Sequence, residues 1–296
     1  MRILLTGATG FIGSHVARAL VREGHEVHVL VRAESNLGRI EDLTSSLHLI
    51  KGDLLNPAFV LHPSAFDLGL HLAWHVEPGN YLHQPQKEDW IVASLRLASA
   101  LRDGGCRRFV ATGTSFEYAP SDLPQRESSP TKPSTAYGQA KLELFEALRR
   151  SIDIDLAWLR PFYLYGPDED QRRLVPVVIN SLLRGQETKL VPGERVRDYL
   201  HIEDVASAIC AVAGSQLTGA VNIASGVPIT VREIALKIGE ALDRVDLLKL
   251  GALPYAASEP LYLLADNTKL REGTGWKPRY PIDEGLRQTI EWWKSR

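Results

Sequence analysis

Two residues suited to proton transfer, Tyr137 and Lys141, stand four positions apart in a stretch expected to be helical. That spacing places both side chains on one face of the helix. An ammonium beside a phenol favours the phenolate, so we expect Lys141 to lower the pKa of Tyr137 from its usual ~10. Tyr137 would then exchange a proton with an alcohol or sugar oxygen while a hydride moves at carbon. Most tyrosine–lysine pairs at this spacing lie on the protein surface without a catalytic role. The neighbouring segments of the sequence must therefore show whether this pair is catalytic.

A run of hydroxyl side chains precedes this pair by about twenty residues. Residues Thr112–Tyr118 read TGTSFEY and end an expected strand over 108–112. In open α/β sheets ligands bind at the carboxyl ends of the strands. A hydroxyl in this segment would therefore hold the substrate oxygen opposite the tyrosine.

The first thirteen residues, MRILLTGATGFIG, combine a short apolar strand with a glycine-rich turn, and a helical pattern follows to about Glu23. Gly7 permits a tight turn, Gly10 lets the backbone approach a pyrophosphate, and Gly13 lets the helix pack against the strand. The phosphates would bind the free N–H groups at the positive end of the helix. This stretch predicts a dinucleotide-binding element.

Two further residues bear on the cofactor. Arg32 follows an expected strand over 27–31 and lies nineteen residues beyond Gly13. An acidic residue at about this place suits the 2′-hydroxyl of NAD, whereas arginine suits the 2′-phosphate of NADP. We therefore expect NADP(H), with NAD(H) as the alternative if Arg32 is only a solvated strand end. Asp53 follows the next strand and would either accept from an adenine amino group or cap a helix.

The strand-end hydroxyl, the Tyr-x-x-x-Lys pair and the amino-terminal GxxGxxG together resemble the extended short-chain dehydrogenase/reductase superfamily. The resemblance covers essentially the whole chain, and its motifs are typical of the branch that acts on nucleotide sugars. The other matching segments are GDL at 52–54, HLA at 71–73, LRPFYLYGP at 159–167, RDYLHIEDV at 197–205, NIASG at 222–226 and GWKP at 275–278.

The resemblance implies a role for each matching residue. Thr114, Tyr137 and Lys141 would be catalytic, with Ser115 as the second candidate hydroxyl, and no metal is implied. Arg197 would pair with the diphosphate of the sugar nucleotide, a use that suits guanidinium. The implied substrate contacts are Thr114, Ser115, Arg197 and Tyr199. The implied cofactor contacts are Gly7, Gly10, Phe11, Ile12, Gly13, Arg32, Asp53, Leu54, Leu72, Ala73, Tyr137, Lys141 and Pro161.

The sequence departs from this family pattern in two places. The 4,6-dehydratases of the family have an Asp-Glu pair where this chain has Ser115 and Phe116, so we do not expect a dehydratase. Members of the family often carry an arginine shortly before the position of Asp266, and Glu259–Ala265 contains none.

Three functions remain compatible with these residues. The favoured one is an NADPH-dependent ketoreductase acting on a 4-keto nucleotide sugar, because the TSFEY stretch resembles such enzymes and Arg32 suits a reductant cofactor. The second is a nucleotide-sugar epimerase, which needs the same Tyr and Lys on a tightly bound cofactor. The third is a non-catalytic regulatory protein, although relatives of that kind usually lack the pair that Tyr137 and Lys141 form.

Expected strands alternate with expected helices over the first half of the chain, which predicts a Rossmann-type, doubly wound parallel sheet. Residues 1–166, rejoined by about 197–222, would form the NAD(P)-binding domain. Residues 167–196 and 223–296 would form a smaller substrate-binding lobe over the carboxyl ends of the strands. The expected strands are 3–5, 27–31, 47–50, 68–73, 108–112 and 154–159, the last halted by Pro161, and the later helices are 87–102 and 134–150.

Bulk properties limit the partners. The 296 residues are 44% hydrophobic and 24% charged with a net charge of −2, which favours neither nucleic acid nor an anionic membrane as a partner. No stretch has the length of a signal peptide or a membrane span, and Cys106 and Cys210 form no disulfide framework, so we expect a cytoplasmic protein. Family members often dimerise through helices matching 87–102 and 135–150, and the resemblance therefore predicts a two-fold homodimer. Leu142, Phe145 and Leu148 would supply that interface or, alternatively, belong to the core.

Overall fold

The computed structural model of the protein describes residues 1–61, 66–76, 81–82, 88–255 and 260–296. Its centre is a seven-stranded sheet in which every adjacent pair is parallel, in the order β10-β6-β5-β4-β1-β2-β3. This is the Rossmann-type sheet predicted from the sequence. Its strands are β1 (Arg2–Thr6), β2 (Glu26–Val31), β3 (Leu47–Lys51), β4 (Leu68–His71), β5 (Arg108–Thr112), β6 (Asp155–Pro161) and β10 (Gly219–Ile223).

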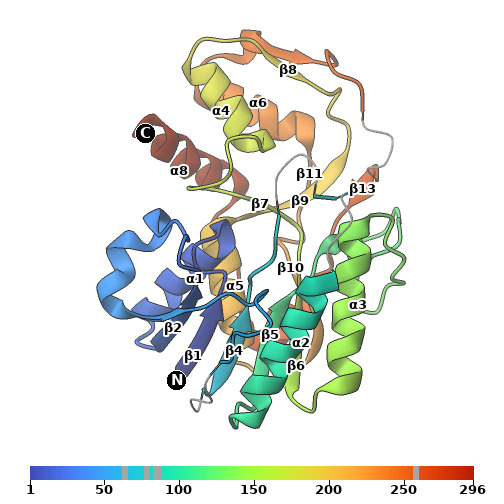
Figure 1. Ribbon diagram of the computed structural model, residues 1–296. Helices are drawn as coiled ribbons and strands as arrows, with labels where there is room; N and C mark the ends of the chain where they lie inside the picture. The colour runs from blue at the N-terminus through green and yellow to red at the C-terminus, as the bar shows by residue number, and fades with distance from the viewer. Residues whose placement is uncertain (62–65, 77–80, 83–87, 256–259) are drawn as a thin grey trace.

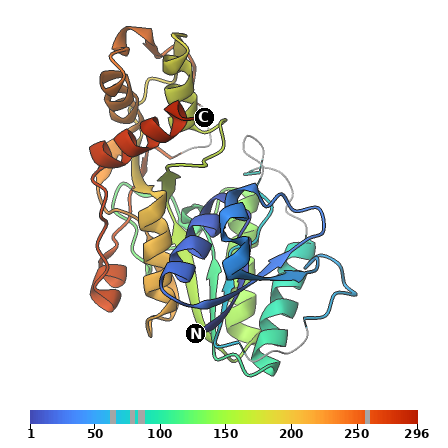
Figure 2. The same cartoon turned by 90° about the vertical axis from the view of Figure 1, so that its left-hand side faces the viewer.

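Helices cover both faces of this sheet, and Figure 2 shows them on its two sides. Helices α1 (Phe11–Arg22) and α5 (Ile202–Ala213) pack on one face, while α2 (Glu88–Asp103) and α3 (Ala136–Ser151) pack on the other. Successive strand side chains point to opposite faces. The apolar run at the start of β1 is therefore buried on both sides of the sheet, which is typical of parallel sheets.

The chain order reverses between β1 and β4, since β2 and β3 extend the sheet on one side of β1 and β4 extends it on the other. Ligands in open α/β sheets bind in the crevice at such a switch point, outside the carboxyl ends of the strands. The glycine-rich turn follows β1 at this place. The sheet topology thus puts the predicted dinucleotide element where the fold binds ligands.

A second group of elements lies beyond the carboxyl ends of the large sheet (Figure 1). Its small sheet has the order β11-β9-β13, with β7 paired to β9, and β8 pairs with β12. An apolar cluster holds three helices of this lobe together. The elements are β7 (Tyr163–Tyr165), α4 (Leu174–Leu183), β8 (Thr188–Leu190), β9 (Val196–His201), β11 (Pro228–Thr230), α6 (Val231–Ala241), β12 (Leu248–Leu250), β13 (Tyr262–Leu263) and α8 (Ile282–Lys294).

The chain passes between the two groups more than once. Strand β9 belongs to the small sheet, whereas α5 and β10 return to the large one. Helix α7 (Thr268–Thr274) also packs beside β10 and α5. None of the helices in the described ranges is both long and apolar enough to cross a membrane.

The structure corrects two expected strand ends. Strand β4 ends at His71 rather than at Ala73. Pro161 does not halt the sixth strand but is its last residue, paired with Ile223 of β10. The pairing between β5 and β6 stops at Leu159, so the missing N–H of the proline costs no bond to β5. Strand β10, at the edge of the sheet, was not predicted as a strand.

The apolar residues of α3 that could have formed a dimer interface are part of the core. Phe145 and Leu148 are buried, and the Phe145 ring stacks on Trp158 of β6 at 5.2 Å between centroids. Leu142 is partly buried against the same cluster. These side chains therefore pack within the chain, which was the alternative to an interface. Lys87, the expected start of the preceding helix, lies outside the described residues.

Candidate active site

The glycine-rich turn between β1 and α1 has the geometry that a dinucleotide requires. Gly7 has φ +81°, and a Cβ there would lie 2.6 Å from the backbone nitrogen of Ala73. A Cβ at Gly13 would collide with the carbonyl of Gly7, so the helix packs directly on the turn. Gly10 caps the helix without a side chain, and the first turn carries no acidic residue. The first N–H groups of a helix have no partner within it. This end of α1 therefore fits the pyrophosphate of a dinucleotide.

Leu72 and Ala73 are tied to the end of β1 beside this turn. The Leu72 N–H donates to the Thr6 carbonyl at 3.1 Å, and the Ala73 N–H donates to Thr6 Oγ1 at 3.3 Å. His71 is buried next to them, with Nδ1 2.7 Å from Thr6 Oγ1 and Nε2 2.9 Å from Ser94 Oγ. Burial lowers the pKa of His71 to about 3. His71 is therefore a neutral, structural side chain at neutral pH.

The predicted adenosine end differs in detail from the sequence-based expectation. The Asp53 carboxylate caps a turn by accepting the N–H of Leu55 at 2.9 Å, and no helix begins there. Arg32 is half exposed, and its Nε lies 3.5 Å from Oε1 of Glu34. A carboxylate thus accompanies the guanidinium that was expected to select NADP. Glu34 was not predicted from the sequence, because only the turn after β2 brings the two side chains together.

Helix α3 brings Tyr137 and Lys141 to the carboxyl end of β5. The helix starts just before the tyrosine, where the Thr135 hydroxyl caps it by accepting the Gly138 N–H at 3.1 Å. Lys141 is buried, and its Nζ donates to the Thr112 carbonyl at 2.8 Å and lies 3.8 Å from the centre of the Trp74 ring. Tyr137 is buried as well, and the Thr114 side chain lies close enough to it to lower its pKa. The structure therefore brings together all three predicted catalytic residues.

Burial controls the ionisation of this pair. It raises the pKa of Tyr137 well above the usual value, with Tyr81 and Glu117 adding to the effect and Thr114 opposing it. This direction is opposite to the expected one, because the Lys141 ammonium is directed at the Thr112 carbonyl and the buried phenol has lost its hydration. Burial also lowers the pKa of Lys141 to about 7, an effect that Glu117 opposes.

The shifted pKa of Lys141 makes a prediction about stability. The pKa is about 7 in the folded protein against an ordinary 10.5, so between these values the unfolded chain binds more protons than the native one. Stability should therefore rise with pH across this window. The unfolding free energy of the wild type minus that of Lys141→Met should increase by more than about 1 kcal/mol from pH ~7 to pH ~9.5. Urea denaturation measures it, and a difference that does not change with pH contradicts the prediction.

The predicted substrate residues lie on both groups of elements. Thr114 and Ser115 are buried at the start of the short 3₁₀ helix η2 (Ser115–Glu117), which Thr114 caps. Arg197 and Tyr199 are buried on β9. A further aromatic residue, Tyr163, connects them. Its ring lies 5.2 Å from the Arg197 guanidinium, 5.4 Å from the Tyr199 ring and 6.5 Å from the Phe116 ring. The aromatic cluster thus runs from the Thr114 turn to the predicted diphosphate arginine.

A second cation, not predicted from the sequence, lies near the tyrosine. Arg173, the residue that precedes α4, has its guanidinium 5.2 Å from the centre of the Tyr81 ring, and Tyr81 contacts the Tyr137 ring edge-on at 5.1 Å. The charge of Arg173 lowers the pKa of Tyr137, although burial outweighs it. No local motif marks Arg173, because only the packing of the second lobe brings it to the catalytic helix.

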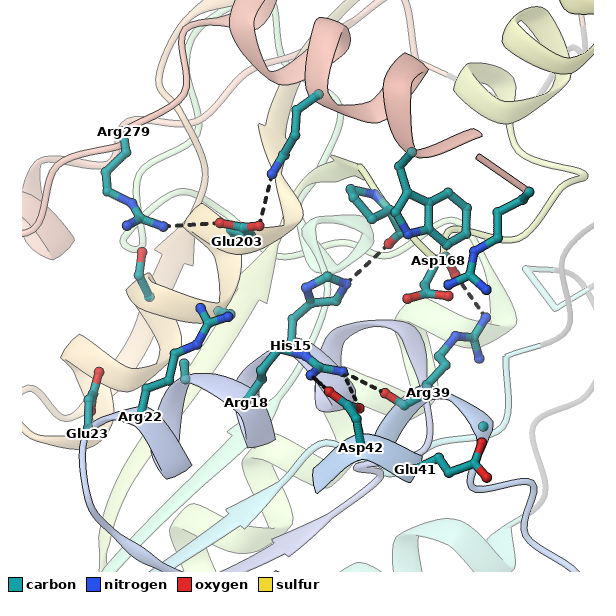
Figure 3. A pocket seen from close by; sticks show the side chains of 18 of the residues that line it. His15, Arg18, Arg22, Glu23, Arg39, Glu41, Asp42, Asp168, Glu203 and Arg279 are labelled. Atoms are coloured by element: carbon teal, nitrogen blue, oxygen red, sulfur yellow. Dashed lines mark hydrogen bonds and ion pairs between the residues drawn. The ribbon is translucent and has the colours of Figure 1, made fainter. Parts of the chain in front are cut away.

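A groove of about 1010 Å³ lies elsewhere, between α1, α5, α8 and the 3₁₀ helix η1 (Gly38–Ser46) (Figure 3). The described residues that line it do not include the Tyr–Lys pair. Arg18 pairs with Asp42 on its wall, and Arg39 donates to the carbonyls of Thr9 at 3.4 Å and Asp168 at 2.9 Å. Arg39 therefore links the glycine-rich turn to the segment that leads into the second lobe.

One group of possible metal ligands occurs in the part of the chain that the structure describes. Glu26 and His28 of β2 gather with His48 of β3. Arg2 already occupies this group, since its Nε lies 3.2 Å from His28 Nε2 and 3.3 Å from Glu26 Oε1. The group is separate from the site around Tyr137, to which we assign no metal.

The parallel sheet, the glycine turn and the buried Tyr137–Lys141 pair define a short-chain dehydrogenase/reductase of the extended type. The family model "NAD dependent epimerase/dehydratase family" matches residues 3–224. The chain therefore belongs to this family of NAD-dependent enzymes.

Relatives with known names match along the whole chain. UDP-glucose 4-epimerase of Mycolicibacterium smegmatis is 30% identical over 315 aligned positions, covering 100% of this chain and 99% of the relative. A solved UDP-glucose 4-epimerase of Thermotoga maritima has a TM-score of 0.87 at 25% identity, covering 100% and 99% of the two chains. A UDP-N-acetylglucosamine 4-epimerase of Methanobrevibacter ruminantium has a TM-score of 0.90 at 25% identity, covering 99% and 98%.

Proposed function

We propose that the protein is a nucleotide-sugar 4-epimerase that uses a bound nicotinamide dinucleotide. The convergence of Tyr137, Lys141 and Thr114 supports acid–base chemistry at a sugar oxygen. The observation that carries the choice of an epimerase is the similarity to relatives of known activity. Full-length similarity to 4-epimerases supports UDP-linked sugars as the substrates. The NADPH-dependent ketoreductase, which the sequence alone favoured, has no such support from the relatives.

The residues of this chain would act on one oxygen. The Thr114 hydroxyl would hold the 4-oxygen of the sugar, and the Tyr137 phenol would take its proton and later return it. A bound nicotinamide dinucleotide supplies a hydride acceptor that can give the hydride back. Because burial raises the pKa of Tyr137, the phenol must first give its own proton to water before it can take the proton of the sugar. The Arg173 cation would favour that release.

The aromatic side chains fit a reaction that changes the configuration of the sugar. Tyr81, Phe116 and Tyr163 surround the Thr114–Tyr137 end of the site. Aromatic rings provide contact area without fixing the direction of a hydroxyl. An epimerase must present both faces of its sugar to the same tyrosine, and such walls would allow this. The nucleotide would lie toward Arg197 and Tyr199 in the second lobe.

Assays with defined sugars test the proposal. We expect the protein to interconvert UDP-glucose and UDP-galactose, or their N-acetylated forms, without net oxidation or reduction of the cofactor. Product analysis by anion-exchange chromatography and absorbance at the NAD(P)H band give the two readouts. Stoichiometric NADPH loss with a 4-keto nucleotide sugar, and no isomer exchange, would establish the ketoreductase instead.

The choice of cofactor gives a separate prediction from Arg32. If its guanidinium selects the 2′-phosphate, NADP(H) should bind more tightly than NAD(H), and Arg32→Asp should reverse the preference. Glu34→Gln is the matched variant, because it removes the partner of Arg32 and should strengthen NADP(H) binding. Dissociation constants by calorimetry measure both effects. Equal or tighter NAD(H) binding by the wild type contradicts the prediction.

A further inference from the structure

Glu117 is a fully buried carboxylate in the turn that follows β5, and the functions considered so far do not use it. Its exposed fraction is 0%, and its carboxylate accepts hydrogen bonds from three residues. The Thr114 N–H donates to Oε1 at 2.8 Å, and the Trp158 indole N–H donates to both oxygens at 2.9 and 3.1 Å. Arg160 Nε donates to Oε2 at 2.7 Å. Two side chains of strand β6 thus bind the Glu117 carboxylate, and the carboxylate in turn binds the backbone N–H of Thr114.

The backbone around Glu117 leaves it little freedom. Gly113 has no room for a Cβ, because the Glu117 carboxylate and the Trp158 indole fill that space. On the other side of the turn, a Cβ at Gly138 of the catalytic helix would collide with the Phe116 carbonyl. The turn is therefore packed between β6 and the start of α3. A shift of Glu117 would move the Thr114 hydroxyl relative to the tyrosine.

The charge of Glu117 also reaches the catalytic pair. Its carboxylate packs against Gly113, next to the Thr112 carbonyl that binds Lys141 Nζ. Burial raises the pKa of Glu117, while Arg160, the indole and the Thr114 N–H oppose this shift. The nearby carboxylate in turn raises the pKa of Arg160, and we treat the two as an ion pair. Other titratable groups also face Tyr137 and Lys141. His71 lies near Lys141, and Tyr81 and Arg173 lie near Tyr137.

We propose that Glu117 is a positioning residue of this site: through the Thr114 N–H it fixes the hydroxyl against Tyr137, and it keeps a negative charge behind Lys141. The catalytic part of this inference rests on the proposed epimerase function. The electrostatic part does not, because it concerns the ligand-free protein.

The first variant separates charge from shape. Glu117→Gln keeps an oxygen for the Thr114 N–H but removes the charge that Arg160 and Lys141 face. We expect kcat to fall by roughly 10- to 100-fold, as misplacement of a reacting group does, with the KM for UDP-glucose little changed. In a Thr114→Val background the same substitution should cost far less, because Glu117 acts through Thr114. Fully additive effects would overturn the positioning role.

A readout without turnover tests the charge. The protein is labelled with nitrogen-15 lysine, and its Nζ resonances are followed by NMR as the pH changes. The resonance that disappears in Lys141→Met belongs to Lys141 and reports its pKa. Removing a nearby anion disfavours the ammonium, so Glu117→Gln should lower this pKa below the wild-type value of about 7. An unchanged Lys141 pKa would overturn the electrostatic role. If the wild type turned over no nucleotide sugar, the epimerase proposal would fail while this measurement still decided the role of the charge.

Two further variants complete the test. Asp204→Asn is the matched control, since Asp204 is an equally buried carboxylate that accepts the N–H groups of Arg279 and Tyr280 at 2.9 Å. It should lower the melting temperature without altering kcat or the Lys141 pKa. Glu117→Asp serves if the glutamine variant does not fold. Aspartate keeps the negative charge, but its side chain is one methylene shorter and would bind the Thr114 N–H less well. We therefore expect kcat to fall while the pKa of Lys141 stays unchanged. A Glu117→Asp protein with wild-type kcat would overturn the proposal.

Discussion

Tyr137→Phe should lower turnover by ~10²–10⁴-fold, the usual contribution of a positioned acid–base group. The substitution removes only the phenolic oxygen, so the edge-on contact with Tyr81 and the packing of α3 should survive. We therefore expect an unchanged melting temperature and an unchanged dissociation constant for the cofactor. Turnover with the correct sugar at saturating cofactor measures the effect.

The control is another buried tyrosine. Tyr165 in the second lobe is 1% exposed, and its pKa is also raised by burial. Tyr165→Phe should leave turnover within about threefold of the wild type, since removing a phenol that transfers no proton forfeits no acid–base catalysis. If Tyr137→Phe retained near-wild-type turnover while the chemical step limits the rate, Tyr137 would not be the proton-transfer residue.

Lys141→Ala should lose turnover and cofactor affinity together. Lys141 lies between the Thr112 carbonyl and the ring of Trp74, which follows the predicted cofactor contacts Leu72 and Ala73. One ammonium would therefore serve both the tyrosine and the cofactor. A charge-assisted hydrogen bond contributes ~1.5–3 kcal/mol, which corresponds to a roughly 10- to 100-fold weaker dissociation constant. Turnover should fall by at least a similar factor. Calorimetric titration with NAD(P)⁺ and steady-state assays measure the two losses.

Lys269 provides the matched lysine control for this experiment. Like Lys141, it donates to backbone carbonyls, those of Thr218 at 2.8 Å and Ala220 at 2.6 Å, but it does so at the edge strand β10. Lys269→Ala should destabilise the fold without changing cofactor affinity. A Lys141→Ala variant that bound cofactor as the wild type does would contradict the double role and leave Lys141 with the tyrosine alone.

The class of fold and the position of the cofactor turn were predictable from local sequence. Gly7 and Gly13 mark places where a Cβ has no room, and such backbone requirements are visible in residue type. The i,i+4 spacing of Tyr137 and Lys141 likewise fixes a shared helix face wherever the helix lies. Strand ends were less predictable. Pro161 extends β6 because β5 has already ended beside it, and this depends on the register of a neighbouring strand.

Only the tertiary structure decided the electrostatics of the candidate site. Local spacing predicted that Lys141 would lower the pKa of Tyr137, but burial raises it, because desolvation depends on everything packed around the phenol. Arg173 comes from the second lobe, and Glu117 owes its ion pair to Arg160 on a separate strand. A residue type states which charge a side chain can carry. Which charge it does carry depends on how close side chains from distant parts of the chain lie, and on how much water those parts exclude.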